Sequence, residues 1–165
     1  MSVSQTCDWC FRAVMFIAVA VSSAATLAAD AADEEAIRTD RARMAGEWRV
    51  VSIEANGNTN ADSVVAGITV VNRLDGTWSL LSNGNIIAEG TSTIDPTTKP
   101  KTIELKGIRA SVENARGTHY RGIYEVHETT RRLCFVPADK PLPESFSGGR
   151  DTGQILVAFE KVVFE

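Results

Sequence analysis

The stretch that decides the fold is residues 46–54, with the sequence GEWRVVSIE. It begins with Gly46-Glu47-Trp48, and from Trp48 onward apolar and polar side chains largely alternate, a period of two that is typical of a half-buried β-strand. The strand-like stretches that follow read as return passes against this one. We therefore expect residues 46–54 to form the first strand of an antiparallel β-barrel.

Seven further stretches have the same character and are separated by turns or loops. They are residues 68–72, 77–81, 85–93, 102–105, 118–127, 131–136 and 154–163. Asp75-Gly76 and Asn83-Gly84 tolerate the positive φ angles of two-residue hairpin loops, which favours a meander. No connection after Gly46 reads as the helix that a parallel crossover requires. Because eight twisted strands tend to close on themselves, the sequence predicts an all-β fold, an eight-stranded antiparallel up-and-down (lipocalin-like) barrel.

A charged segment, residues 31–44, precedes the barrel and reads as a helix. Asp33 is a candidate N-cap, and Arg41 and Arg43 fall in the last turn, where they suit the helix dipole. The apolar stripe is thin, because it consists of Ile37 and Met44. We expect a short N-terminal helix that lies on the barrel rather than in its core.

The first 29 residues have the pattern of a secretory signal peptide. Arg12 provides a positive charge, residues 13–29 carry no charge, and small side chains surround the expected cleavage region at residues 28–31. The apolar run is short for a membrane span, although a retained anchor stays open as the alternative. Asp30 stands where a lipoprotein would need a cysteine. The predicted organisation is a signal peptide at 1–29, a short helix and linker at 30–45, and a barrel domain at 46–165, exported to the periplasm or secreted.

The charge of the chain argues against two classes of partner. The net charge is −4, and no basic run occurs. Nucleic acids and anionic membrane surfaces both attract clustered Lys and Arg. We therefore expect no nucleic-acid partner and no stable membrane insertion after signal cleavage. Two segments read as loops, residues 56–63 and the long proline- and glycine-containing stretch 137–153.

The sixth and seventh expected strands allow a prediction of register. With the turn at Thr129-Thr130, Tyr124 lies opposite Phe135 and Val126 lies opposite Leu133. These four side chains then share one apolar face, while the other face is mostly polar. We expect this apolar face to point into the barrel.

The candidate residues for the barrel interior, or for the wall of a ligand site, are mainly large apolar side chains on strands. Trp48 and Trp78 could form a stacking wall for an apolar or aromatic ligand, but tryptophans on strands also serve as ordinary barrel core. The full set is Trp48, Trp78, Leu80, Tyr124, Val126, Leu133, Phe135, Val157 and Phe159.

The sequence offers little catalytic or metal-binding chemistry. His119 and His127 are eight residues apart, roughly 26 Å along one strand, so they cannot share a metal. Arg131-Arg132 reads as a solvated charge pair. Residues 137–153 lack the ending of a phosphate-binding loop, and no nucleophile elbow occurs. We expect no catalytic residue, no cofactor, no metal and no enzymatic activity.

The cysteines point to a structural role rather than a reactive one. Cys7 and Cys10 form a C-x-x-C pair, but they lie in the segment predicted to be removed. Cys134 then remains as the single thiol and cannot form an internal disulfide. In the expected register Glu125 lies opposite Cys134 and would raise its pKa, so an inert thiol is expected.

Several stretches together resemble a known family. They are residues 46–52, 88–91, 95–105, 122–125, 133–135 and 153–156. As a set they resemble the uncharacterised lipocalin-like domain family that is abundant in secreted proteins of planctomycete bacteria, over residues 44–161. The resemblance implies a small eight-stranded barrel and no activity. Gly46-x-Trp48 is also similar to the start of true lipocalins, in which the Trp lies beneath a basic residue from the last strand; this implies such a place for Lys161.

Two functional hypotheses follow. The first is an exported, non-enzymatic binding module that holds a small apolar ligand in the barrel, since eight strands leave an interior just wide enough for side chains or one small ligand. The second is a periplasmic or secreted protein-interaction module, such as an enzyme inhibitor or an envelope scaffold. Residues 31–44 or 137–153 would make that contact, the latter also as a lid.

Overall fold

The computed structural model describes residues 20–60, 65–110 and 117–163. The chain divides into two compact units, residues 1–35 and 36–165. The described part of the first unit is helical and belongs to α1 (Ala20–Met44), whose remaining residues lie in the second unit. Residues 1–19, which include Cys7 and Cys10 and most of the predicted signal peptide, lie outside the described residues.

The predicted start of the helix at Asp33 is wrong, whereas its end is confirmed. α1 already begins by Ala20 and has 25 residues. Residues 20–32 are rich in alanine, the strongest helix former, so no sequence signal stops the helix before Asp33. The helix ends at Met44, just before Gly46, whose φ of 109° suits glycine. In the described part of the chain, no helix combines the length and apolar character needed to cross a membrane.

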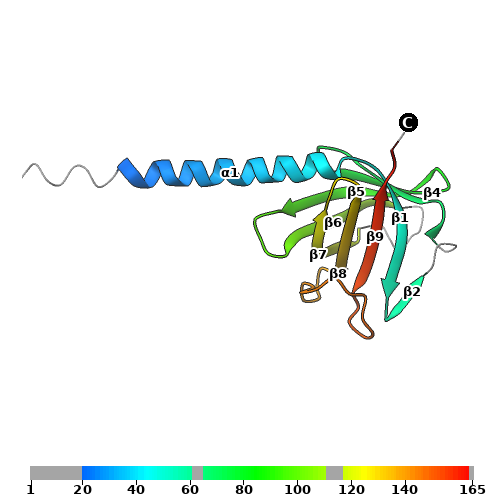
Figure 1. The fold of residues 1–165 in the computed structure, drawn as a ribbon. Helices are drawn as coiled ribbons and strands as arrows, with labels where there is room; N and C mark the ends of the chain where they lie inside the picture. The colour runs from blue at the N-terminus through cyan, green and yellow to red at the C-terminus, as the bar shows by residue number, and fades with distance from the viewer. Residues whose placement is uncertain (1–19, 61–64, 111–116, 164–165) are drawn as a thin grey trace, which may run out of the picture. The chain divides into compact units, whose positions relative to one another are not determined.

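The second unit is a closed antiparallel barrel, as predicted (Figure 1). Its strands are β1 (Gly46–Ala55), β2 (Asn58–Asn60), β3 (Ile68–Asn72), β4 (Thr77–Ser82), β5 (Asn85–Asp95), β6 (Lys101–Ala110), β7 (His119–Val126), β8 (Thr130–Pro137) and β9 (Ile155–Lys161). From β3 onward each strand pairs with the next in the chain, and β1 pairs with both β3 and β9. That pairing closes an eight-stranded ring, to which β2 is attached only through the end of β1.

The strand β2 corrects the expectation that residues 56–63 form a loop. Asn56 and Gly57 adopt φ angles of 52° and 72°, the conformation of a two-residue hairpin turn that returns the chain along β1. Asn83 and Gly84 do the same between β4 and β5, with φ angles of 50° and 79°. β2 was missed because its three residues, Asn-Thr-Asn, have no apolar face.

The predicted register of the β7–β8 hairpin is wrong by two residues. The His127 amide donates to the Thr130 carbonyl over 2.8 Å, so the turn lies one position earlier than expected. Tyr124 consequently pairs with Leu133, and Gly122 pairs with Phe135. Because side chains alternate with a period of two, a slip of two residues leaves every side chain on its predicted face.

The corrected register changes the neighbours on the outer face. Glu125 lies opposite Arg132, not opposite Cys134, and its carboxylate is 2.5 Å from the Arg132 Nε. Cys134 lies opposite Ile123, and both side chains are fully buried. The predicted carboxylate neighbour of the thiol is therefore absent from the paired position.

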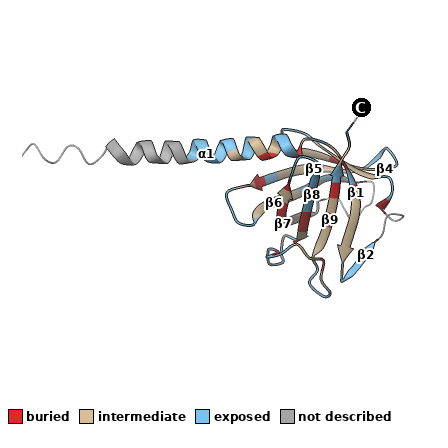
Figure 2. Cartoon of the chain, viewed as in Figure 1, coloured by how far each residue is buried: buried red, intermediate tan, exposed pale blue. Residues whose placement is uncertain are grey.

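The last turn of α1 closes one end of the barrel, which corrects the expectation that this helix only lies on the surface. Met44 is 3% exposed, and its carbonyl accepts a hydrogen bond of 2.7 Å from the Trp48 indole. Asp40 is also buried, and it accepts hydrogen bonds from the Tyr124 hydroxyl over 2.8 Å and from Lys101 over 2.6 Å. Figure 2 shows buried residues at this end of the helix and along the strands.

Candidate functional site

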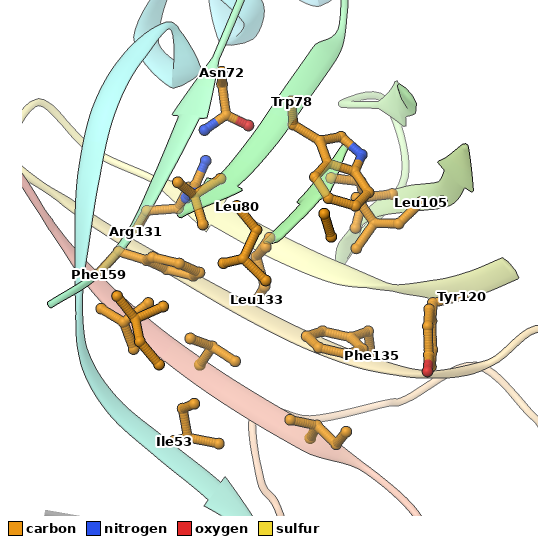
Figure 3. A pocket seen from close by; sticks show the side chains of 18 of the residues that line it. Ile53, Asn72, Trp78, Leu80, Leu105, Tyr120, Arg131, Leu133, Phe135 and Phe159 are labelled. Carbon is orange, nitrogen blue, oxygen red and sulfur yellow. The ribbon is translucent and has the colours of Figure 1, made fainter. Parts of the chain in front are cut away.

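The barrel contains a cavity of about 340 Å³. Each of the eight ring strands contributes to its wall, and Met44 contributes from the end of α1. The lining is almost wholly aliphatic and aromatic, and Figure 3 shows these side chains converging on the interior. The volume is at the small end of the range of about 300–1,000 Å³ that is typical of ligand pockets.

The structure separates the nine interior candidates into two groups. Those that line the cavity are Trp78, Leu80, Leu133, Phe135, Val157 and Phe159. Trp48, Tyr124 and Val126 are buried but do not line it, with exposures of 0%, 1% and 7%. Trp48 and Tyr124 bond to the last turns of α1, so these side chains fill the closed end as ordinary core.

Burial changes along the cavity from one end of the barrel to the other. Side chains at the α1 end, such as Met44 and Phe159, are buried. Those at the opposite end, such as Ile68, Tyr120 and Phe135, are only partly buried. Solvent therefore approaches the cavity from the end away from α1.

Two glycines shape the aromatic part of the wall. The Trp78 indole donates to the Thr91 carbonyl over 3.0 Å, and its ring covers Gly90, where any Cβ would overlap the ring. A Cβ on Gly122 would likewise overlap Phe135, its partner on β8. The glycines thus leave room for broad rings to lie flat against the strands.

Arg131 is buried inside the barrel, so the prediction that it is a solvated charge is wrong. It is 2% exposed and lines the cavity. Its guanidinium carbon lies 4.9 Å from the Trp48 ring centroid and 4.2 Å from that of Phe159, distances at which a cation is attracted to an aromatic face. Burial lowers the pKa of the Arg131 guanidinium to about 9. Strand alternation was the missed signal, because Arg131 has the same parity as Leu133 and Phe135.

Asn72 is the second polar residue that sequence reasoning missed. It lines the cavity at the end of β3, two and four residues beyond Val70 and Ile68, which line it too. Among the described residues, the buried side-chain polar atoms without a hydrogen-bond partner are the Asn72 Nδ2 and the Arg131 Nε. Both are hydrogen-bond donors, and both belong to the cavity wall.

Lys161 lies near the place implied by the similarity to true lipocalins. Its Nζ is 5.3 Å from the Trp48 ring centroid and donates to the Arg43 carbonyl over 3.3 Å. The Arg131 guanidinium also stacks on Trp48, from the inner side of the barrel. Trp48 therefore has two basic neighbours, one from β8 and one from β9.

The histidines and the cysteine lie away from the cavity lining. His119 is exposed, with its Nε2 3.4 Å from the Glu104 carboxylate, a neighbour that sequence spacing did not suggest. His127 is exposed after the end of β7. Burial raises the pKa of the Cys134 thiol, which contacts the Ser147 carbonyl at 3.4 Å. No cluster of three or more potential metal ligands occurs within the described residues.

The long loop after β8 is bonded to the wall of the barrel. Gly148 accepts a hydrogen bond of 2.8 Å from the Gly57 amide and donates one of 3.2 Å to the Glu54 side chain. Ser147 covers Cys134 on the outer face of β8. None of the cavity-lining residues comes from this loop.

Comparison with known proteins gives a distant likeness in fold. No family model matches the chain, and no curated protein matches it. Among solved structures, the crystal structure of a DUF4847 family protein from Bacteroides vulgatus is similar, with 13% sequence identity and a TM-score of 0.42, over 74% of this chain and 96% of that one. This likeness implies no function for the chain. The resemblance to the lipocalin-like family of planctomycete proteins stays a prediction.

Proposed function

We propose that this protein is an exported, non-enzymatic barrel that binds a small apolar ligand in its interior. The observation that carries the proposal is the cavity of about 340 Å³ with its aliphatic and aromatic wall. Protein interiors are normally close-packed, and an empty apolar cavity of this size costs on the order of several kcal/mol of stability. A ligand that fills the cavity would recover that packing energy.

Two parts of the proposal rest on the sequence. Export is supported by the charge-free residues 13–29 and the small side chains at residues 28–31. Cleavage there would leave Asp30–Met44 as the N-terminal helix and would keep the last turn that closes the barrel. The non-enzymatic character is supported by the lack of any recognisable catalytic motif. The N-terminal residue of the protein recovered from the cell envelope tests export directly.

Ligand binding is tested with the full chain and a neutral apolar dye. Native mass spectrometry and solvent extraction of the purified protein identify any molecule that co-purifies. In parallel, the neutral dye N-phenyl-1-naphthylamine is titrated into wild type, Ala88→Phe and Ile86→Phe. Ala88 lines the cavity, whereas Ile86, on the same strand, is 52% exposed.

The expected result is that Ala88→Phe blocks dye binding and Ile86→Phe does not, because only the first variant fills the cavity. Equal dye binding by the two variants would place the dye outside the barrel. Absence of both dye binding and a co-purifying molecule in the wild-type protein would overturn the proposal.

The protein-interaction alternative has less support. The last turn of α1 is engaged in closing the barrel through Met44 and Asp40. The long loop after β8 is bonded to the β1–β2 hairpin through Gly148. The segments expected to contact a partner protein are thus held against the barrel itself, and the ligand-binding function is the one that we propose.

A further inference from the structure

We propose that the ligand is a single-chain amphipathic molecule with a carboxylate at one end, and that Arg131 and Asn72 bind this carboxylate at the α1 end of the cavity. This inference rests on the proposed function and specifies its ligand class. It follows from the charge of Arg131, the placement of the two unpaired donors and the apolar character of the remaining wall.

The first step concerns the charge of Arg131. Buried basic side chains are normally paired with a carboxylate, because an uncompensated buried charge is costly. Within the described part of the chain, no ion pair joins Arg131 to an acidic residue, and its Nε has no hydrogen-bond partner. The nearby buried carboxylate, Asp40, is engaged with Lys101 and Tyr124. The contacts that Arg131 does make are with the faces of the Trp48 and Phe159 rings.

The second step concerns where the unpaired donors lie. Asn72 ends β3 opposite Gly46, the first residue of β1, and Arg131 stacks on Trp48, two residues farther along β1. Both donors therefore belong to the closed end of the barrel. Figure 3 shows the Asn72 amide and the Arg131 guanidinium at one end of the cavity, with Tyr120 toward the other.

The third step is the chemistry that fits this arrangement. A guanidinium presents a planar fork of donors to the two oxygens of a carboxylate, and the Asn72 amide adds another donor. A neutral hydrocarbon would leave the Arg131 charge uncompensated, and a cationic amphiphile would be repelled by it. The rest of the wall would hold an apolar tail that extends toward Tyr120 and Phe135, the end that solvent approaches.

The cavity volume limits the length of the tail. A water-sized group takes up about 30 Å³ in a liquid, so a cavity of about 340 Å³ holds on the order of ten such groups. A medium-chain carboxylic acid fits this estimate. Decanoate is therefore the probe, and decanol is its uncharged counterpart.

The test compares decanoate and decanol by isothermal titration at pH 7.5, with the full-length protein and both probes below their micellar concentrations. The variants are Arg131→Met, Asn72→Leu and the matched control Arg132→Met. Arg132 is the next residue on β8, but it faces outward and is ion-paired with Glu125. Wild type and Arg132→Met should bind decanoate roughly tenfold to a hundredfold more tightly than decanol, the range expected for hydrogen bonds to a charged group.

Arg131→Met should abolish this preference while it keeps decanol binding, and Asn72→Leu should reduce the preference to a smaller extent. Equal affinity of the wild-type protein for the two probes, or an undiminished preference in Arg131→Met, would overturn the carboxylate site and leave the apolar-ligand proposal standing. Failure to bind either probe or the neutral dye would overturn both. If Arg131→Met does not fold, Asn72→Leu decides, since an unchanged preference there would overturn the assignment of the two donors.

Discussion

Arg131→Met should make the ligand-free protein more stable, although it removes an interior side chain with two aromatic contacts. The reason is the charge. Burial lowers the pKa of the Arg131 guanidinium from 12.5 to about 9. At about 1.36 kcal/mol per pH unit, this difference corresponds to a cost of roughly 5 kcal/mol for keeping the side chain charged in the folded protein at pH 7. Methionine has no charge to bury and retains most of the apolar stem.

The aromatic contacts work in the opposite direction. The guanidinium lies within cation–π distance of Trp48 and Phe159, and a desolvated contact of this kind contributes about 1–2 kcal/mol. A methionine sulfur in the same place recovers about 0.3–1.5 kcal/mol from an aromatic neighbour. The net expectation is a gain of about 1–3 kcal/mol. For a protein of this size, each kcal/mol raises the melting temperature by about 2–4 °C.

The assay is equilibrium urea unfolding of delipidated protein at pH 7, followed by far-ultraviolet circular dichroism. Arg132→Met is the control, and it should lose no more than about 1 kcal/mol, because its ion pair with Glu125 is largely solvated. Saturating decanoate should reverse the order of wild type and Arg131→Met, since a ligand stabilises only the protein that binds it. A loss of 2 kcal/mol or more in ligand-free Arg131→Met would refute the reasoning, because it would show that the buried charge is compensated within the protein.

Three further predictions concern the same barrel. Tyr124→Phe should lower the free energy of unfolding by about 1.5–3 kcal/mol in urea titrations, because it removes a buried donor to the Asp40 carboxylate; an unchanged midpoint would contradict this. Gly122→Ala should cost about 1–3 kcal/mol through overlap with β8, whereas Gly149→Ala, which meets no close backbone, should leave the melting temperature nearly unchanged. Decanoate affinity should be constant from about pH 6 to 8 and fall about tenfold per pH unit above about 9, because the free Arg131 guanidinium loses its proton there; a pH-independent affinity up to pH 10.5 by titration calorimetry would count against the site.

The alternation of apolar and polar residues predicted the strands and their inner faces well, and the β7–β8 hairpin shows why. The predicted register was wrong by two residues, yet Tyr124 and Leu133 still point inward. Parity is robust because a slip of two residues leaves each side chain on its face. The exact turn position is less secure, because nothing in Glu128-Thr129-Thr130 distinguishes one turn from the next.

Local signals failed where a segment had no apolar face or where helix propensity extended past a plausible cap. β2 consists of three exposed polar residues and is held only by pairing with the end of β1. α1 runs past Asp33 because the alanine-rich residues before it favour helix as strongly as those after it. In both cases the deciding contacts or propensities lay outside the short pattern on which the prediction was based.

The sequence by itself determined that this chain makes a ring of antiparallel strands with a mainly apolar interior, because strand periodicity and Asn-Gly turns are local properties. Only the tertiary structure decided that the interior is partly hollow and that Arg131 and Asn72 lie in its wall. Whether a barrel is filled depends on the summed volumes of side chains from every strand. Whether a buried charge is paired depends on residues as far apart in the chain as Trp48 and Arg131, and no local pattern records either quantity.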